Sequence, residues 1–94
     1  MNPSEEYVFP KRGSKSKNRS MLAAMTNKQS HEDGTLSDEE ITWLTRRAKD
    51  GFGIVTTAAS HVSELGKGWI GEMGVWSDNH IDGLTKLASS LKQH

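Results

Sequence analysis

Two short groups of small and hydroxyl-bearing residues have the types and positions best suited to ligand binding. Ala24-Met25-Thr26-Asn27 ends one predicted strand, and Thr57-Ala58-Ala59-Ser60-His61 ends another. In parallel α/β sheets and barrels, ligands bind beyond the carboxyl ends of the strands. Small side chains there let the backbone approach a flat ligand, and Thr26 offers a hydroxyl donor. The same residues could instead be small because the strand ends are crowded, so both interpretations stay open at this point.

A glycine-rich segment, Gly66-Lys67-Gly68-Trp69-Ile70-Gly71, matches the G-x-G-x-x-G pattern. That pattern binds a dinucleotide when its glycines join a strand end directly to a helix N-terminus. Here the preceding predicted strand ends near residue 59 and the next predicted helix begins near residue 78. The glycine-rich loop of protein kinases is excluded too, because that motif has valine at the position where this chain has Met73. We therefore predict a glycine-rich loop between a strand and a helix.

Other reactive side chains form no convincing site. His31, Glu32 and Asp33 are adjacent in a loop, and neighbours of this kind rarely converge on one metal ion. His61 follows the second predicted strand and could face a ligand, although a lone loop histidine is more often solvated. No Ser–His–Asp order or carboxylate pair carries a geometric signature, and there is no Cys. We predict neither a catalytic residue nor a metal site within this chain.

Composition narrows the class of protein. The 94 residues are 33% apolar and 26% charged, and 12 Lys and Arg balance 12 Asp and Glu. A neutral chain offers no global electrostatic attraction for nucleic acid or an anionic membrane. No apolar run approaches the ~18 residues of a membrane-spanning helix, and residues 1–10 hold no signal-peptide core. We predict a cytoplasmic protein with neither nucleic acid nor membrane as a partner.

The first 19 residues differ from the rest. Their basic side chains cluster between residues 11 and 19, and no periodic apolar pattern runs through them. A basic arm for phosphate is one interpretation, and a solvated loop or hairpin is the other. No aromatic residues interleave with the charges, which favours the second. We therefore divide the chain into an arm, residues 1–19, and a folded part, residues 20–94.

The folded part begins with a strand and a helix. The apolar run of residues 20–25 predicts a strand buried on both faces. Ser37 and Glu40 have the spacing of a capping box, in which each side chain bonds to the other residue's backbone. They open a predicted helix over residues 38–50, and Gly51 stands where a helix end favours a left-handed residue.

A second strand and helix follow. Residues 53–58 form a β-branched run typical of a strand. Ser77-Asp78 opens a second predicted helix, whose buried stripe consists of Ile81, Leu84, Leu87, Ala88 and Leu91. The order strand, helix, strand, helix indicates a right-handed parallel crossover. Parallel sheets seldom consist of two strands, so the pattern is typical of part of a larger α/β architecture.

These segments also carry a family pattern. From Lys17 to His94 the chain resembles the start of the Old Yellow Enzyme family, the FMN-dependent NAD(P)H:flavin oxidoreductases and ene-reductases. The matching stretches are Lys17-Asn18-Arg19, Ala24-Met25-Thr26, Asp33-Gly34-Thr35 with Asp38-Glu39, Arg46-Arg47-Ala48-Lys49, Gly53-Ile54-Val55-Thr56-Thr57-Ala58, Gly66-Lys67-Gly68, Gly74-Val75-Trp76-Ser77-Asp78 and Ile81-Asp82-Gly83-Leu84. Phe9-Pro10 looks like the start of the family's N-terminal hairpin, which closes the bottom of the barrel.

The resemblance implies a fold and a cofactor. The fold is the N-terminal βαβα quarter of a TIM (β/α)8 barrel, preceded by a loop or hairpin arm. The cofactor is FMN, reduced by NADH or NADPH, which passes hydride to a small-molecule acceptor such as an activated alkene. By resemblance, Ala24, Met25, Thr26 and Ala58 contact FMN, and Thr26 hydrogen-bonds the flavin carbonyl near N5. The parent enzyme is expected to be a homo-oligomer.

The chain departs from the family's pattern at two positions, and it is much shorter than a complete barrel. The family usually has proline where this chain has Ala24, and often glutamate where it has Thr57. A complete barrel needs roughly 250 residues, and the family's substrate-anchoring and phosphate-binding residues have no counterpart here. The 94 residues alone are expected to be inactive. The alternative is a stand-alone, non-enzymatic α/β module that self-associates to complete its sheet.

Overall fold

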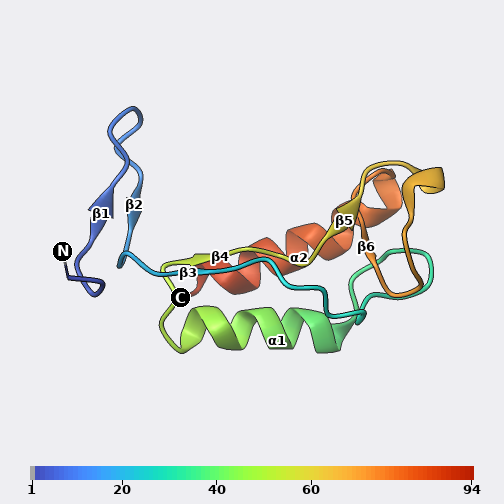
Figure 1. Cartoon of the computed structure of the whole chain (residues 1–94), viewed down its shortest axis with the longest axis horizontal. Coiled ribbons are helices and arrows are strands. Elements are labelled where there is room, and N and C mark those ends of the chain that lie inside the picture. The colour runs from blue at the N-terminus through green and yellow to red at the C-terminus, as the bar shows by residue number, and fades with distance from the viewer. Residues whose placement is uncertain (1) are drawn as a thin grey trace.

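A computed structural model describes residues 2–94 as a hairpin followed by two strand–helix units (Figure 1). In the hairpin, β1 (Tyr7–Val8) pairs antiparallel with β2 (Lys15–Ser16). β3 (Met21–Leu22) then pairs parallel with β4 (Ile54–Val55), and the helix α1 (Asp38–Lys49) connects them. The predicted parallel crossover is thus confirmed.

The second unit continues beyond β4 with a further small sheet. β5 (Ser60–His61) pairs parallel with β6 (Met73–Gly74), and the 3-10 turn η1 (Glu64–Gly66) lies between them. A second 3-10 turn, η2 (Asp78–His80), leads directly into the helix α2 (Ile81–Lys92). No helix in this described part of the chain is long and apolar enough to cross a membrane.

The ends of α1 follow from its sequence. The Ser37 hydroxyl accepts a hydrogen bond from the Glu40 amide (3.1 Å), and acidic residues fill the first turn, where the helix dipole favours them. Gly51, with φ +135°, follows the last turn. Lys17 Nζ donates to the Ala48 carbonyl of α1 (2.9 Å) and to the His94 carbonyl beyond α2 (3.2 Å). One ammonium of the predicted arm therefore holds the ends of both helices.

The capping box itself was only half right. The Glu40 side chain does not return to Ser37 but accepts a hydrogen bond from the Ser30 hydroxyl. Glu40 is fully buried, because the loop before α1 covers it. A carboxylate that is withdrawn from water needs a donor, and Ser30 supplies one inside the protein.

The hydrophobic core lies between the β3–β4 sheet and the two helices. Its buried members are Leu22, Leu36, Ile41, Leu44, Met73 and Leu87. Around them pack the partly buried Trp43, Phe52, Val55, Leu84 and Leu91. The helices are also joined by a hydrogen bond between Thr45 Oγ1 and Ser90 Oγ (2.7 Å). Lys86 adds a bond to Asp38 (3.0 Å), so the two helices form one layer.

β3 and β4 are shorter than the strands that the sequence predicts. Regular pairing covers only residues 21–22 and 54–55 instead of 20–25 and 53–58. The expected burial of both faces was also wrong, because Met21 is 59% exposed while its neighbour Leu22 is 7% exposed. Each strand has one neighbour among residues 2–94, so nothing extends the ladder or covers its second face.

The predicted stripe of α2 was wrong at two positions. Leu87 is buried and Leu84 and Leu91 are half-buried, as the helical spacing requires. Ile81, however, is 53% exposed, and Ala88 is exposed as well. Both are apolar positions that no other described element covers.

One side of the β3–β4 sheet stays open. Leu22 and Val55 face the core, so Met21 and Ile54, which alternate with them, face the other side. We call the side that carries Met21 and Ile54 the open face. In Figure 1 the hairpin rises at one end of β3–β4 and the β5–β6 unit at the other, both away from α1.

Candidate functional site

The carboxyl ends of β3 and β4 lie next to each other. Their parallel register pairs Met21 with Ile54 and Leu22 with Val55. The Ile54 amide donates to the Ser20 carbonyl (3.2 Å), and the Thr56 amide to the Leu22 carbonyl (3.3 Å). The residues that follow each strand therefore start from the same edge of the sheet.

The four residues predicted to bind the cofactor have two environments. Ala24, Met25 and Thr26, which follow β3, are all exposed, Met25 to 47%. Ala58, which follows β4, is buried at 7% exposure. Its carbonyl accepts hydrogen bonds from Thr57 Oγ1 (3.3 Å) and Ser60 Oγ (3.2 Å). The segment after β3 thus presents exposed side chains, whereas the segment after β4 presents a backbone held in place by hydrogen bonds.

The loop after Thr26 is held in a strained conformation. Lys28 has φ +51°, in the left-handed region that non-glycine residues seldom adopt. Gly71 packs on it so closely that an added Cβ would lie 2.7 Å from the Lys28 carbonyl oxygen. The Ser30 amide also donates to the Gly71 carbonyl (3.1 Å). The last glycine of the G-x-G-x-x-G segment therefore fixes the loop beside the candidate site.

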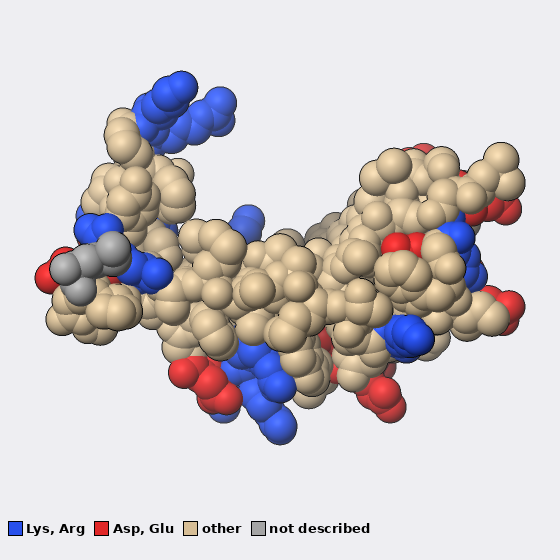
Figure 2. Space-filling view, viewed as in Figure 1, with Lys and Arg blue, Asp and Glu red and all other residues tan. Residues whose placement is uncertain are grey.

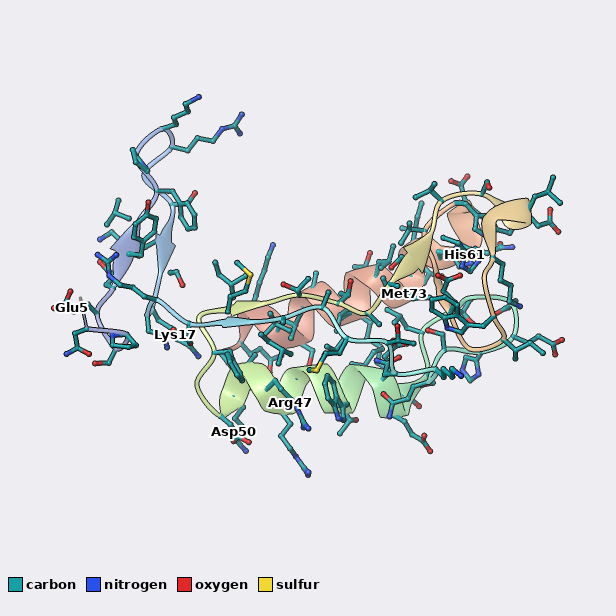
Figure 3. The ribbon with its side chains drawn as sticks, viewed as in Figure 1. Glu5, Lys17, Arg47, Asp50, His61 and Met73 are labelled. Carbon is teal, nitrogen blue, oxygen red and sulfur yellow. The ribbon has the colours of Figure 1, made fainter. Side chains whose placement is uncertain are left out.

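The expectation of a solvated His61 was wrong. His61 is 5% exposed, and its Nδ1 lies 3.3 Å from Oε1 of Glu72, which is 7% exposed. The same Glu72 oxygen accepts a hydrogen bond from the Gly68 amide (2.8 Å). Figure 3 shows His61 beside Met73, where β5 and β6 meet. No motif spacing links His61 to Glu72, so sequence reasoning had no signal for this pair.

His80 is a second buried histidine that sequence reasoning missed. Its Nδ1 accepts a hydrogen bond from the Ser77 amide (3.2 Å), and its Nε2 donates to the Asp33 carbonyl (2.9 Å). Both ring nitrogens are therefore used in joining the loop before α1 to the start of α2. Gly74 packs on this ring, where an added Cβ would lie 2.8 Å from Nε2. His80 positions the loops and has no nitrogen left for a ligand.

The acidic loop residues also serve the fold. Asp33 accepts hydrogen bonds from the Thr35 hydroxyl (2.6 Å) and amide (3.0 Å), which lower the pKa of its carboxyl group. At the first residue of α1, Lys86 likewise lowers the pKa of Asp38 through a hydrogen bond and its charge. Residues 2–94 contain no group of three or more His, Asp or Glu side chains placed to hold a metal ion.

Comparison with known proteins defines the class. The chain superimposes with a TM-score of 0.90 on a 2-naphthoyl-CoA reductase solved with 2-naphthoyl-CoA, at 34% identity, covering 98% of this chain and 14% of that one. It superimposes at 0.86 on the Old Yellow Enzyme homologue from Zymomonas mobilis, at 20% identity, covering 99% and 25%. Its fold is therefore that of the first strand–helix units of an Old Yellow Enzyme TIM barrel.

The sequence defines the family. The profile of the NADH:flavin oxidoreductase / NADH oxidase family matches residues 12–94. A probable NADH-dependent flavin oxidoreductase of Bacillus subtilis is 36% identical over 96 residues, covering 98% of this chain and 26% of the relative. The chain belongs to the NADH:flavin oxidoreductase family and spans about a quarter of that relative's length.

Proposed function

We propose that this chain forms the first two βα units of an FMN-dependent NAD(P)H oxidoreductase. The observation that carries the proposal is the adjacency of the two strand ends, since parallel pairing brings residues 24–26 and Ala58 to one edge of the sheet. Ligands of α/β barrels bind at that edge. The family membership supports flavin as the ligand.

The residues present fit a flat, partly polar ring system. Ala24 is small and exposed, so an isoalloxazine ring meets no bulky side chain there. Met25 offers a polarizable apolar surface, and Thr26 offers an exposed hydroxyl as a donor to a ring carbonyl. Ala58 is buried, so its part is to keep the neighbouring strand end compact. Bound FMN supplies transfer of a hydride from reduced nicotinamide to an electron-poor acceptor.

The acceptor is proposed by class only. The Bacillus subtilis relative is described as NADH-dependent, and the 2-naphthoyl-CoA reductase was solved with an aromatic thioester. We propose as acceptor a small molecule with an activated double bond, reduced at the expense of NADH or NADPH. The groups that bind the acceptor and the nicotinamide are proposed to lie on the remaining units of the barrel.

The open face favours a second candidate, a non-enzymatic module that self-associates to complete its sheet. Met21 lies on that face and is largely exposed, and water is a poor solvent for such a side chain. Light scattering separates the two candidates, because self-association by sheet completion predicts a defined oligomer and a stable monomer contradicts it.

The experiment for the enzyme is a chimera. This chain replaces the corresponding first quarter of the Bacillus subtilis relative, and the purified chimera is examined for flavin absorbance and for flavin reduction by NADH. The expected result is one FMN per chain. A folded but colourless chimera contradicts the proposal.

A threonine variant tests the proposed contact. Removing a hydrogen bond to a carbonyl that gains charge on reduction costs about 1.5–3 kcal/mol, which is about 30–60 mV for two electrons. In the chimera, Thr26→Val is therefore expected to lower the reduction potential of the bound flavin by about 30–60 mV. Thr42→Val, on the exposed side of α1, is the matched control and should leave the potential unchanged.

A further inference from the structure

A pocket of about 330 Å³ lies between the loop before α1 and the β5–β6 unit. Residues 32–33 form one side of it, β5 and η1 another, and the residues that lead into α2 a third. The residues proposed to contact flavin, 24–26 and Ala58, do not belong to its lining. A pocket of this size accommodates a small molecule. It is therefore a candidate binding site separate from that of the flavin.

His61 brings an unpaired imidazole to this pocket (Figure 3). It is 5% exposed, and its Nδ1 makes no hydrogen bond within residues 2–94, although Glu72 Oε1 lies 3.3 Å away. An added Cβ on Gly74 would lie 3.2 Å from Nε2, so the glycine leaves that nitrogen uncovered. His80, by contrast, uses both of its ring nitrogens. A buried polar group without a protein partner is rare and indicates a role in binding.

Glu72 determines which nitrogen of His61 accepts a hydrogen bond. Its carboxylate is 7% exposed and is held by the Gly68 amide (2.8 Å). Because the negative charge faces Nδ1, a neutral imidazole carries its proton there and keeps Nε2 as the acceptor. The His61 carbonyl accepts a hydrogen bond from the Val75 amide (3.0 Å), so the ring is attached to a fixed strand. The pocket therefore selects a ligand that donates a hydrogen bond.

The rest of the lining favours a positive charge. Three carboxylates line the pocket, those of Glu32, Asp33 and Glu64. Lys67 supplies the single ammonium among the described residues of the lining, and its Nζ donates to the Glu32 carbonyl. Figure 2 shows Asp and Glu side chains projecting from this end of the molecule, whereas the tip of the hairpin is basic. An anionic ligand would be repelled by the three carboxylates, whereas a cation would neutralise them.

Trp76 adds an aromatic wall. Its indole packs edge-to-face on His80, with 5.5 Å between ring centroids, and the residue is 39% exposed. An indole ring attracts a cation to its face and also covers apolar groups. A ligand that combines a positive charge with an apolar body therefore suits both the carboxylates and the indole.

We propose that this pocket binds an organic cation, an ammonium group that carries a small apolar or aromatic body. The ammonium donates a hydrogen bond to Nε2 of His61, and the carboxylates of the lining balance its charge. The apolar body lies against Trp76. The proposal does not depend on flavin, because this chain supplies every residue of the pocket.

Three ligands of similar shape and different charge test the proposal: benzylammonium, benzyl alcohol and benzoate. Each is titrated into the 94-residue chain labelled with nitrogen-15, and the histidine ring nitrogens are followed by NMR. Benzylammonium should bind saturably and about tenfold or more tightly than benzyl alcohol, with benzoate the weakest. The ring resonances of His61 should shift, whereas those of the exposed His31 should not. The chimera gives the same readout in a complete barrel.

Variants of the lining locate the binding. His61→Phe keeps an aromatic ring but removes the acceptor, so it should weaken benzylammonium binding about tenfold or more. Trp76→Leu, at a more exposed position, should weaken it about threefold or more. Glu64→Gln should also weaken it, whereas Glu39→Gln, at an exposed position in the first turn of α1, is the matched control and should not.

Four results would overturn the proposal. They are equal or tighter binding of benzoate, no saturable binding of benzylammonium, unmoved His61 resonances, and unchanged affinity in both His61→Phe and Trp76→Leu. Because the titration needs no flavin, each of these results leaves the proposed oxidoreductase function untouched.

Discussion

The helix side and the open side of the β3–β4 sheet differ sharply, although the same strands form both. On the helix side Leu22, Leu44 and Leu87 are 7%, 1% and 4% exposed. On the open side Met21 is 59% exposed. Side chains alternate along a strand, so each strand must supply both faces. The contrast shows that residues 2–94 cover the helix side of the β3–β4 sheet by themselves and leave its other side open.

The largest expected effect tests the outer layer. Leu44→Ala removes the most buried leucine of the core and should lower the free energy of unfolding by about 2–5 kcal/mol. Met25→Ala, at a 47% exposed position beyond β3, should change it by about 0.5 kcal/mol or less. Urea unfolding followed by circular dichroism measures both. Equal losses for the two variants would contradict the assignment of Leu44 to the core and of Met25 to the exposed surface.

A smaller effect is expected where the arm meets the sheet. An added Cβ on Gly53 would collide with Ser16 Oγ and lie 2.8 Å from the Asn18 carbonyl oxygen. Gly53→Ala should therefore cost about 1–3 kcal/mol, because the hairpin must shift. Gly68→Ala is the matched control, since its new Cβ would meet only Glu72 Oε1, at 3.6 Å. Thermal unfolding compares the two, and a neutral Gly53→Ala would mean that the hairpin is not anchored there.

The helix cap gives a smaller effect still. Ser37→Ala removes the hydroxyl that accepts the Glu40 amide hydrogen bond and should cost about 1 kcal/mol. Ser89→Ala, in the exposed middle of α2, should be neutral or slightly stabilising, since alanine is the better helix former. Amide hydrogen exchange in the first turn of α1 locates the loss. Unchanged exchange there would contradict the assigned cap.

The smallest effect concerns pH. Hydrogen bonds from Thr35 lower the pKa of Asp33 in the folded chain, so their stabilisation is present above the unfolded pKa and is lost as the pH falls through the folded one. Thr35→Val should move the pKa of Asp33 back toward its ordinary value. NMR titration of the carboxyl carbon measures the shift. An unchanged Asp33 pKa in this variant would show that the hydroxyl does not stabilise the carboxylate.

Local signals in the sequence predicted the helix layer well. The Ser37 cap, the acidic first turn and Gly51 mark α1 almost to the residue, because these effects act within one helical turn. The open face could not be predicted in this way, since the exposure of Met21 depends on which partners are present. Family resemblance, rather than periodicity, identified the barrel.

The candidate site was predictable only in part. The strand ends that carry residues 24–26 and Ala58 could be placed together, because parallel pairing follows from the strand–helix–strand order. The buried pair His61 and Glu72 could not, nor could the bond between His80 and Asp33. Those contacts join loops that are distant in sequence, and no spacing rule connects their residues.

The most direct test is a titration of FMN with the protein, in which binding is measured by the quenching of flavin fluorescence. No measurable binding to the 94-residue chain alone is expected, because its two βα units supply only one wall of the proposed cofactor site. One FMN per barrel is expected once the remaining units are supplied. Tight binding to the chain alone, or none to the completed barrel, would contradict the claim that this chain supplies one wall of a flavin site.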